Sequence, residues 1–153
     1  MAAERHGADT ELLVLPADHL IEDVSGFARS VAAAQSMVRH GALVTFGIVP
    51  THPETGYGYI ETGDELSPGC HRVVRFVEKP NAATAKQYVA SGRFLWNSGM
   101  FCFRADAFLD ALERHAPDVH DATIAAWKAG KQDGDAFHLD PDAFARVPDI
   151  SVD

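Results

Sequence analysis

Residues 12–21, LLVLPADHLI, decide the fold class because a run of large apolar side chains ends there in polar ones. The run stops at Pro16, and Asp18 and His19 follow almost at once. A continuous apolar run of this kind is typical of a strand that is covered on both faces. Ligands of open α/β sheets gather outside the carboxyl ends of such strands, but a carboxylate in this place can equally cap a turn. Position alone leaves both interpretations of Asp18 open.

The next two segments complete a strand–helix–strand pattern. In residues 24–41 apolar side chains recur at helical spacing, and Gly41 stands where a helix would end. Residues 42–50, ALVTFGIVP, are again strand-like. A helix between two strands of one sheet nearly always joins parallel neighbours in a right-handed crossover. We therefore predict an α/β fold with a mostly parallel or mixed sheet flanked by helices.

Residues 51–66, THPETGYGYIETGDEL, are rich in glycine, proline and threonine. Two Gly-Tyr pairs follow one another, so that Tyr57 and Gly58 are adjacent. A hairpin or a β-bulge would explain these glycines. Glycines beside a strand end also let the backbone approach a ligand closely and offer N–H groups to it. Both interpretations remain open at this point.

Residues 71–80, HRVVRFVEKP, predict another strand, which ends in Glu78 and Lys79. An exposed pair of this kind is usually solvated and contributes little to stability. Asn81 is expected to cap the helix that follows, and Gly92 to close it.

Residues 93–105, RFLWNSGMFCFRA, contain an apolar run that is interrupted by the triplet Asn97, Ser98 and Gly99. A β-bulge explains the serine and the glycine. The amide of Asn97 offers both a donor and an acceptor, which suits a polyhydroxylated ligand better. Residues 106–153 are expected to form helical segments.

Composition excludes several classes of partner. A chain of 153 residues suits one domain, residues 1–153. Its net charge of −9 disfavours nucleic acid and anionic membranes, which need basic patches. Cys70 and Cys102 show no CxxC spacing, so we expect reduced thiols in a cytoplasmic protein. The polar start does not resemble a signal peptide, and no apolar run approaches transmembrane length.

Four of these segments together carry a family resemblance. The ordered set VLPADH, TFGIVPTHPETGYGYIE, FVEKP and FLWNSGMF resembles mannose-1-phosphate guanylyltransferase, also called GDP-mannose pyrophosphorylase, in the bacterial form that is often fused to a phosphomannose isomerase domain. The resemblance covers nearly the whole chain, from about residue 12 to residue 153. It implies a Rossmann-like, GT-A-like fold and transfer of GMP from GTP to mannose 1-phosphate, giving GDP-mannose and pyrophosphate. This biosynthesis supplies polysaccharide assembly.

The resemblance also assigns metal ligands. Asp18 is expected to be catalytic and to bind Mg²⁺, because an ionised carboxylate is the acceptor-only oxygen ligand that this ion requires. Asp153 matches the second metal carboxylate of the family. His19 is expected to have a supporting or structural role.

The sugar side of the site follows from the same resemblance. Glu78 and Asn97 suit the mannose hydroxyls, the first as an acceptor and the second as donor and acceptor. Lys79 is expected to be catalytic and to supply a point charge for the sugar phosphate. Tyr57 and Gly58 would line the sugar pocket through ring and backbone.

One part of the family pattern does not occur in this sequence. The Gly-rich, Arg-containing G-x-G-x-R loop, which grips the nucleoside triphosphate, is absent. We therefore expect an internal piece of a larger enzyme that lacks its first nucleotide-binding unit, forms a homo-oligomer, and turns over hardly at all when isolated. Two alternatives remain. One is another hexose-1-phosphate nucleotidyltransferase, and the other is a non-catalytic module that binds a sugar phosphate.

Overall fold

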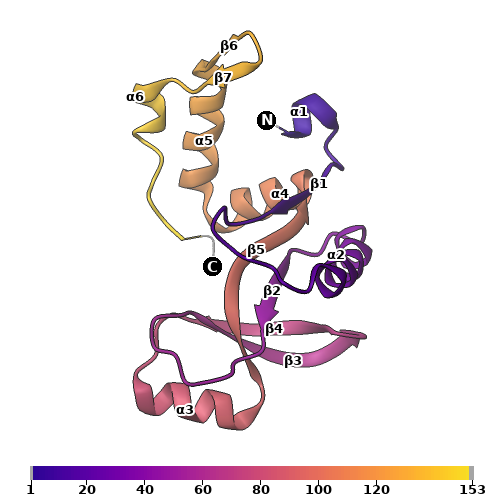
Figure 1. Ribbon diagram of the computed structural model, residues 1–153. Coiled ribbons are helices and arrows are strands. Elements are labelled where there is room, and N and C mark those ends of the chain that lie inside the picture. The colour runs from indigo at the N-terminus through magenta and orange to yellow at the C-terminus, as the bar shows by residue number, and fades with distance from the viewer. Residues whose placement is uncertain (1, 152–153) are drawn as a thin grey trace. The chain divides into compact units, whose positions relative to one another are not determined.

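The computed structural model describes residues 2–151, which form two compact units (Figure 1). One unit comprises residues 11–103. The other contains both ends of the chain, up to residue 10 and from residue 104. Every predicted site residue that the structure describes lies in the first unit.

A five-stranded sheet organises the first unit. Its strands are β1 (Glu11–Val14), β2 (Val44–Ile48), β3 (Tyr59–Ser67), β4 (Cys70–Val77) and β5 (Phe94–Arg104). Strand β5 pairs with β1, β2 and β3, and β4 pairs with β3. The pairings of β2 with β5, β3 with β5 and β3 with β4 are antiparallel. The fold is therefore α/β, as predicted, but the sheet is rich in antiparallel pairs rather than mostly parallel.

The predicted strand–helix–strand unit forms, with helix α2 (Val24–Val38) between β1 and β2. The expectation that β1 and β2 are neighbours is wrong, because both pair with β5 instead. The physical reason is that β5 is the longest strand of the sheet and alternates buried and partly buried residues along most of its length. A strand that is distant in sequence thus competes successfully for both partners.

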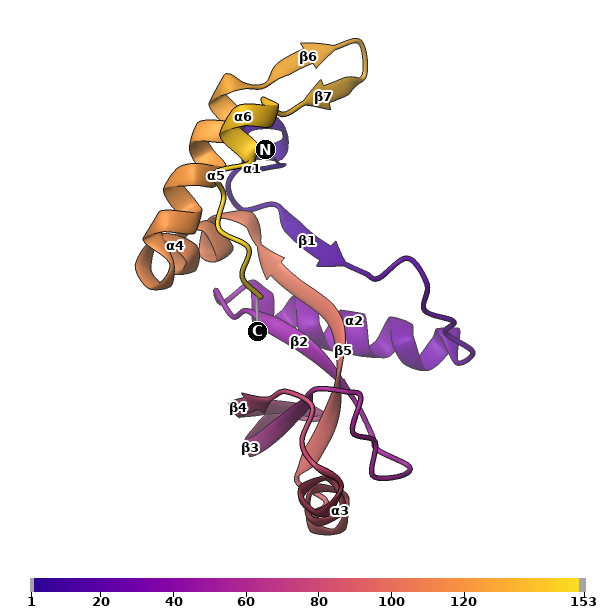
Figure 2. The same ribbon diagram turned by 90° about the vertical axis from the view of Figure 1, so that its left-hand side faces the viewer.

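Helix α2 packs its apolar stripe on the sheet beside β2 and β5 (Figure 2). The carboxylate of Asp23 caps its start by accepting a hydrogen bond from the backbone N–H of Gly26 at 2.8 Å. The buried residues of this core are Ala34, Val38, Phe46, Met100 and Cys102. Burial raises the pKa of the Cys102 thiol, with a smaller contribution from the charge of Glu11.

Helix α3 (Ala82–Ser91) forms the second core with the start of β5. As predicted, Asn81 caps it, accepting a hydrogen bond from the Thr84 N–H at 2.9 Å, and Gly92 ends it in the left-handed conformation. The residues of this core are Tyr59, Ala85, Tyr88, Phe94 and Trp96. It lies directly under the loop that carries Tyr57 and Gly58, because Trp96 contacts the ring of Tyr57.

The second unit is mainly helical, as expected, with α1 (Ala2–His6), α4 (Ala105–His115), α5 (Pro117–Ala129) and α6 (Pro141–Phe144). It also contains a small hairpin of β6 (Lys131–Asp133) and β7 (Ala136–His138), where only helical segments were expected. Trp127 of α5 stacks on Phe137 of the hairpin. Within residues 2–151, none of the helices combines the length and the apolar character needed to cross a bilayer.

Candidate functional site

Three predicted sugar-binding residues lie side by side although they come from three segments. The backbone N–H of Asn97 in β5 donates to the carbonyl of Gly58, in the loop before β3, at 2.8 Å. A Cβ atom at Gly58 would lie 2.9 Å from Oε2 of Glu78, which follows β4, and 3.6 Å from Cβ of Asn97. The absence of a side chain at Gly58 therefore leaves room for the carboxylate of Glu78.

Glu78 and Lys79 form an ion pair with 3.0 Å between Oε1 and Nζ. Both side chains are 64% exposed, so the pair itself contributes only about 0–1 kcal/mol to stability. Lys79 has a φ of +38°, a left-handed backbone that is unfavourable for a residue other than glycine. Strain of this kind costs about 1–3 kcal/mol and clusters at functional sites. The pair therefore adds little to the stability of the fold.

The predicted β-bulge at Ser98 and Gly99 is confirmed. Three residues of β5, 98–100, lie opposite the single residue Phe46 of β2. Gly99 takes a φ of +69°, and the Ser98 hydroxyl donates to the Phe46 carbonyl at 2.5 Å while accepting from the Met100 N–H at 3.2 Å. The polar triplet thus satisfies the backbone groups that the bulge frees from strand pairing.

Asn97 also has a local structural role that sequence reasoning missed. Its side-chain oxygen accepts hydrogen bonds from the Gly99 N–H at 3.2 Å and from the Thr45 hydroxyl at 3.4 Å. These bonds hold the amide of Asn97 in one orientation beside Gly58. A fixed amide is suited to recognising a ligand because little rotamer entropy is lost on binding.

The loop of residues 51–58 is held by Glu54, which was not among the predicted site residues. Its Oε1 atom accepts from the N–H groups of Thr55 at 2.7 Å and Gly56 at 2.9 Å. The bond from Gly56, followed by that from Thr55, holds the pKa of the Glu54 carboxyl below its ordinary value. The hydroxyl of Tyr59, which is fully buried, donates to the Glu54 carbonyl at 2.7 Å.

An aromatic cluster supports the same loop from below. The ring of Trp96 meets His52 edge-on at 5.0 Å between centroids and Tyr57 edge-on at 5.3 Å. Trp96 is 8% exposed, whereas Tyr57 is 51% exposed and can offer a ring face to a ligand. The indole N–H of Trp96 is buried and has no hydrogen-bond partner among residues 2–151.

The metal side of the predicted site is only partly described. Asp18 is exposed in the turn after β1. Its neighbour Pro16 approaches the bulge, since a Cβ atom at Gly99 would lie 3.7 Å from Pro16 Cγ. Asp153 lies outside the described residues. Within residues 2–151 no group of three or more His, Cys, Asp or Glu side chains is arranged to hold a metal. One carboxylate oxygen still fits Mg²⁺ chemically, because this ion often uses one or two carboxylates together with substrate phosphates.

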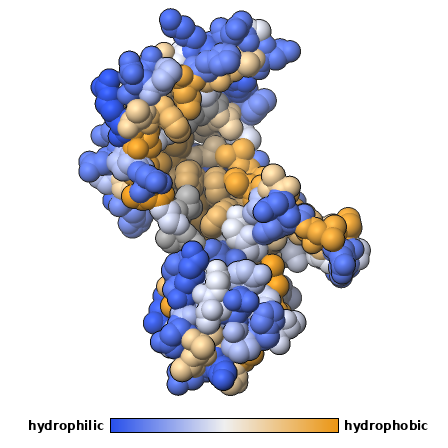
Figure 3. Space-filling model, turned by 60° about the vertical axis from the view of Figure 1, so that its left-hand side comes forward, coloured by the Kyte–Doolittle hydropathy of each residue, from blue (hydrophilic) through white to orange (hydrophobic). Residues whose placement is uncertain are grey.

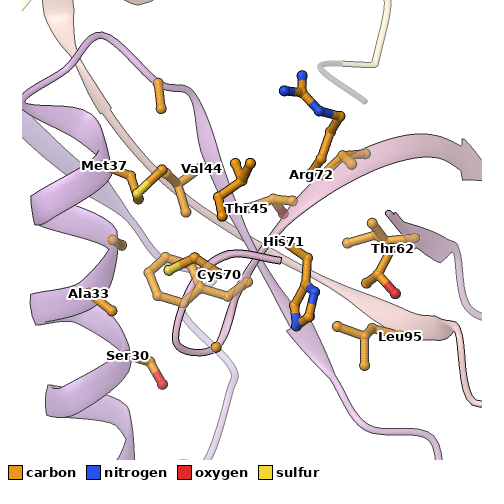
Figure 4. A pocket seen from close by; sticks show the side chains of 18 of the residues that line it. Ser30, Ala33, Met37, Val44, Thr45, Thr62, Cys70, His71, Arg72 and Leu95 are labelled. Carbon is orange, nitrogen blue, oxygen red and sulfur yellow. The ribbon is translucent and has the colours of Figure 1, made fainter. Parts of the chain in front are cut away.

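A separate cavity of about 550 Å³ lies between α2, β2 and the β3–β4 hairpin (Figure 4). Ala33 and Met37 of α2 project toward it, facing Thr45 and Leu95 across the opening. None of the predicted site residues lines this cavity. The cavity and the Gly58–Glu78–Asn97 group are therefore distinct features of the same unit.

Comparison with known proteins agrees with this fold. The family described as nucleotidyl transferase matches residues 1–141. The chain is 51% identical to the xanthan biosynthesis protein XanB of Xanthomonas campestris pv. campestris and 46% identical to the alginate biosynthesis protein AlgA of Pseudomonas syringae pv. tomato. It is 47% identical to mannose-1-phosphate guanylyltransferase of Escherichia coli K12. All of this chain takes part in each match, but it spans only about a third of these relatives, 32%, 32% and 33%.

Two solved structures share the fold with a TM-score of 0.83 and 33% identity over 99% of this chain. One is named mannose-6-phosphate isomerase from Helicobacter pylori, of which 59% is covered. The other is named mannose-1-phosphate geranyltransferase from Thermus thermophilus, of which 42% is covered. The predicted α/β nucleotidyltransferase fold is thereby confirmed. The chain belongs to the nucleotidyl transferase family, as its resemblance to the mannose-1-phosphate guanylyltransferases predicted.

Proposed function

We propose that the protein containing this chain transfers GMP from GTP to mannose 1-phosphate, releasing GDP-mannose and pyrophosphate. Residues 1–153 would be part of its nucleotidyltransferase domain and would contribute the sugar-phosphate half of the site. The observation that carries the proposal is the meeting of Gly58, Glu78 and Asn97, which the family resemblance assigns to the sugar and which the fold brings together from three segments.

The sugar would be recognised by hydrogen bonds and one ring contact. The Glu78 carboxylate accepts from sugar hydroxyls, and the amide of Asn97, whose oxygen accepts from the Gly99 N–H, is a further polar group beside the sugar. Gly58 allows the sugar to lie against the backbone, and the exposed ring of Tyr57 covers one face of it. This arrangement fixes the phosphate of the bound sugar in one direction.

The phosphate oxygen of mannose 1-phosphate would then attack the α-phosphorus of GTP in line, with pyrophosphate as the leaving group. In such transfers the protein mainly positions the reactants and neutralises charge. Lys79 suits this task because its exposed ammonium can leave Glu78 for the incoming phosphate at little cost. Lys79 follows the end of β4 directly after Glu78, so that its ammonium lies beside the carboxylate that would bind the sugar.

Asp18, and Asp153 beyond the described residues, would hold the Mg²⁺ ion. When bound, this ion neutralises phosphate charge during the transfer. Asp18 by itself makes a weak site, since Mg²⁺ relies on substrate phosphates to complete its octahedral coordination. This is one reason why we propose that the isolated chain turns over GTP hardly at all.

The same proposal includes a cytoplasmic location and assembly into a homo-oligomer. Both described cysteines are free thiols, which supports a reducing compartment. Apolar side chains gather on the surface (Figure 3), and large exposed residues around β1 include Leu13, Val14, Leu15, Leu20 and Val24. Exposed apolar residues beside a sheet edge attract partners. Light scattering that gives a clean monomer at high concentration would contradict assembly.

Calorimetry with mannose 1-phosphate and the 153-residue chain tests the sugar half. We expect weak binding that Lys79→Ala reduces, whereas Lys86→Ala, which removes an exposed lysine from α3, leaves it unchanged. Glucose 1-phosphate and N-acetylglucosamine 1-phosphate, titrated in parallel, identify the preferred hexose. Pyrophosphate release with GTP and Mg²⁺, measured on the complete polypeptide, then separates an enzyme from a module that only binds. Loss of binding in the Lys86 variant alone would refute the assignment of Lys79.

A further inference from the structure

The segment that carries Tyr57 and Gly58 contains neither helix nor strand over residues 51–58. A sugar site needs these two residues in a fixed place, because misplacement of binding groups by about 1 Å can cost on the order of a hundredfold in rate. We infer that Glu54, His52 and Trp96 are positioning residues that hold this segment against β5 for sugar binding. The inference rests on the proposed function, since it names how that sugar site is kept in shape.

Glu54 fastens the segment from within. One carboxylate oxygen binds the N–H groups of Thr55 and Gly56, the two residues that lead to Tyr57. The other oxygen lies 3.5 Å from Nε2 of His52. The carboxylate thus joins the start of the segment to its middle. An acceptor that engages two successive N–H groups fixes the backbone direction that leads to Tyr57.

His52 is held at both ring nitrogens. Its Nδ1 atom lies 3.0 Å from the hydroxyl of Thr51, and its Nε2 atom faces Glu54. The ring edge meets Trp96 at 5.0 Å between centroids. His52 therefore connects the carboxylate of the loop to the buried floor beneath it.

Trp96 supports the two ends of the segment from one rigid strand. Its indole contacts His52 at one end and Tyr57 at the other. The next residue, Asn97, binds the Gly58 carbonyl through its backbone N–H. The buried N–H of Trp96 has no partner among the described residues, and leaving it unpaired costs free energy. A phenylalanine would fill the same core position without that cost. Packing alone therefore does not explain an indole, whereas contact with two loop residues does.

The test uses this chain with Trp127→Phe, in which Trp96 is the only tryptophan among the 153 residues, so that its emission reports on the loop; turnover is measured with the same substitution in the complete polypeptide. Into this parent we introduce Glu54→Ala, which removes the internal fastening. The matched control is Glu65→Ala. The carboxylate of Glu65 likewise accepts from the N–H of a turn residue, Gly69, at 3.1 Å, but this turn lies between β3 and β4. Emission and turnover are recorded against mannose 1-phosphate and against GTP.

We expect Glu54→Ala to raise two quantities about tenfold: the concentration of mannose 1-phosphate that gives half of the emission change, and the KM for mannose 1-phosphate. The reason is that the variant loses the hydrogen bonds that the charged carboxylate accepts. The KM for GTP should stay unchanged, and Glu65→Ala should match the parent in both measurements. Glu54→Gln keeps an oxygen for the two N–H groups and should fall between. Circular dichroism of each variant verifies that the fold is retained.

Each outcome decides the matter. If the parent responds to mannose 1-phosphate and Glu54→Ala responds equally well, the inference is wrong and the proposed function stands. If Glu54→Ala raises both KM values alike, or Glu65→Ala behaves as Glu54→Ala does, the effect is general destabilisation and the inference is again wrong. If the parent shows neither response nor turnover, the proposed function fails and the inference falls with it.

Discussion

Replacing Gly58 by alanine should separate stability from sugar binding, because the two effects have opposite signs. The backbone of Gly58 does not lie in the left-handed region, so an L side chain causes no backbone strain there. Alanine restricts the unfolded chain more than glycine does, which stabilises a protein by about 0.4–1 kcal/mol where the native backbone is compatible. The folded state should therefore keep its stability or gain slightly.

The cost appears at Glu78 instead. The new Cβ would lie 2.9 Å from Oε2 of Glu78, at least about 0.5 Å inside an ordinary contact. The Glu78 side chain is 64% exposed and can turn into solvent, so it moves away rather than straining the fold. Displacing the carboxylate that we propose binds the sugar should weaken mannose 1-phosphate binding by roughly tenfold to a hundredfold.

Two measurements on the same samples verify this prediction. Urea denaturation gives the free energy of unfolding, and calorimetry gives the affinity for mannose 1-phosphate. Gly56→Ala is the control in the same loop, because its Cβ would meet Glu54 only at an ordinary 3.4 Å. A Gly58→Ala protein that binds the sugar phosphate as the parent does would refute the idea that the space at Gly58 serves Glu78. A loss of stability above about 1 kcal/mol would refute the backbone argument.

Three further predictions concern the scaffold. Ser98→Ala should lower the free energy of unfolding by about 1–3 kcal/mol in urea denaturation, because the Phe46 carbonyl and the Met100 N–H lose their buried partner; a loss below about 0.5 kcal/mol would contradict this role. Asn81→Ala should cost about 1 kcal/mol by removing the cap of α3, whereas Asn81→Ser should restore most of it. The pKa of the Asp23 carboxyl is held below its ordinary value, chiefly by the Gly26 N–H. Its contribution to the free energy of unfolding is therefore present above about pH 4 and is lost as pH falls through the lowered pKa. Acid unfolding of Asp23→Asn should lack that part of the pH dependence.

Local signals in the sequence were enough for several elements. The triplet in residues 97–99 predicted a bulge because polar residues within an apolar run need hydrogen-bond partners. The structure confirms the bulge and shows such a bond from Ser98 to the Phe46 carbonyl. Asn81 and Gly92 marked both ends of α3 because capping and the left-handed conformation select those residue types. The apolar run before Pro16 marked a strand for a similarly local reason, but the expectation that both of its faces are covered is wrong, because Leu13 and Val14 are exposed.

The remaining features depend on partners that are distant in sequence. Strands β1 and β2 were expected to be neighbours, and nothing within either strand indicates that β5 pairs with both. Glu54 was not singled out in the sequence, because its role depends on the direction of the N–H groups of Thr55 and Gly56. The amide of Asn97 was predicted only to bind a ligand. Its structural role was missed because the contact with Thr45 joins two strands that are distant in sequence. A Pro-Glu-Thr-Gly turn, in which the acid can accept from the residues after it, was the available signal for Glu54.

The central position of β5 determines when the sheet can form during synthesis on the ribosome. Strand β1 ends at Val14 and β5 begins at Phe94, 80 residues later. At common rates of synthesis, about 5–20 residues per second, β1 leaves the ribosome roughly 4 to 16 s before its partner. By the end of that interval β1, β2 and β3 have all been synthesised, and all three have β5 as a partner in the folded sheet. Until β5 is complete, these strands lack the partner that they pair with in the folded sheet, so the nascent chain keeps unpaired strand edges until residue 104 has emerged.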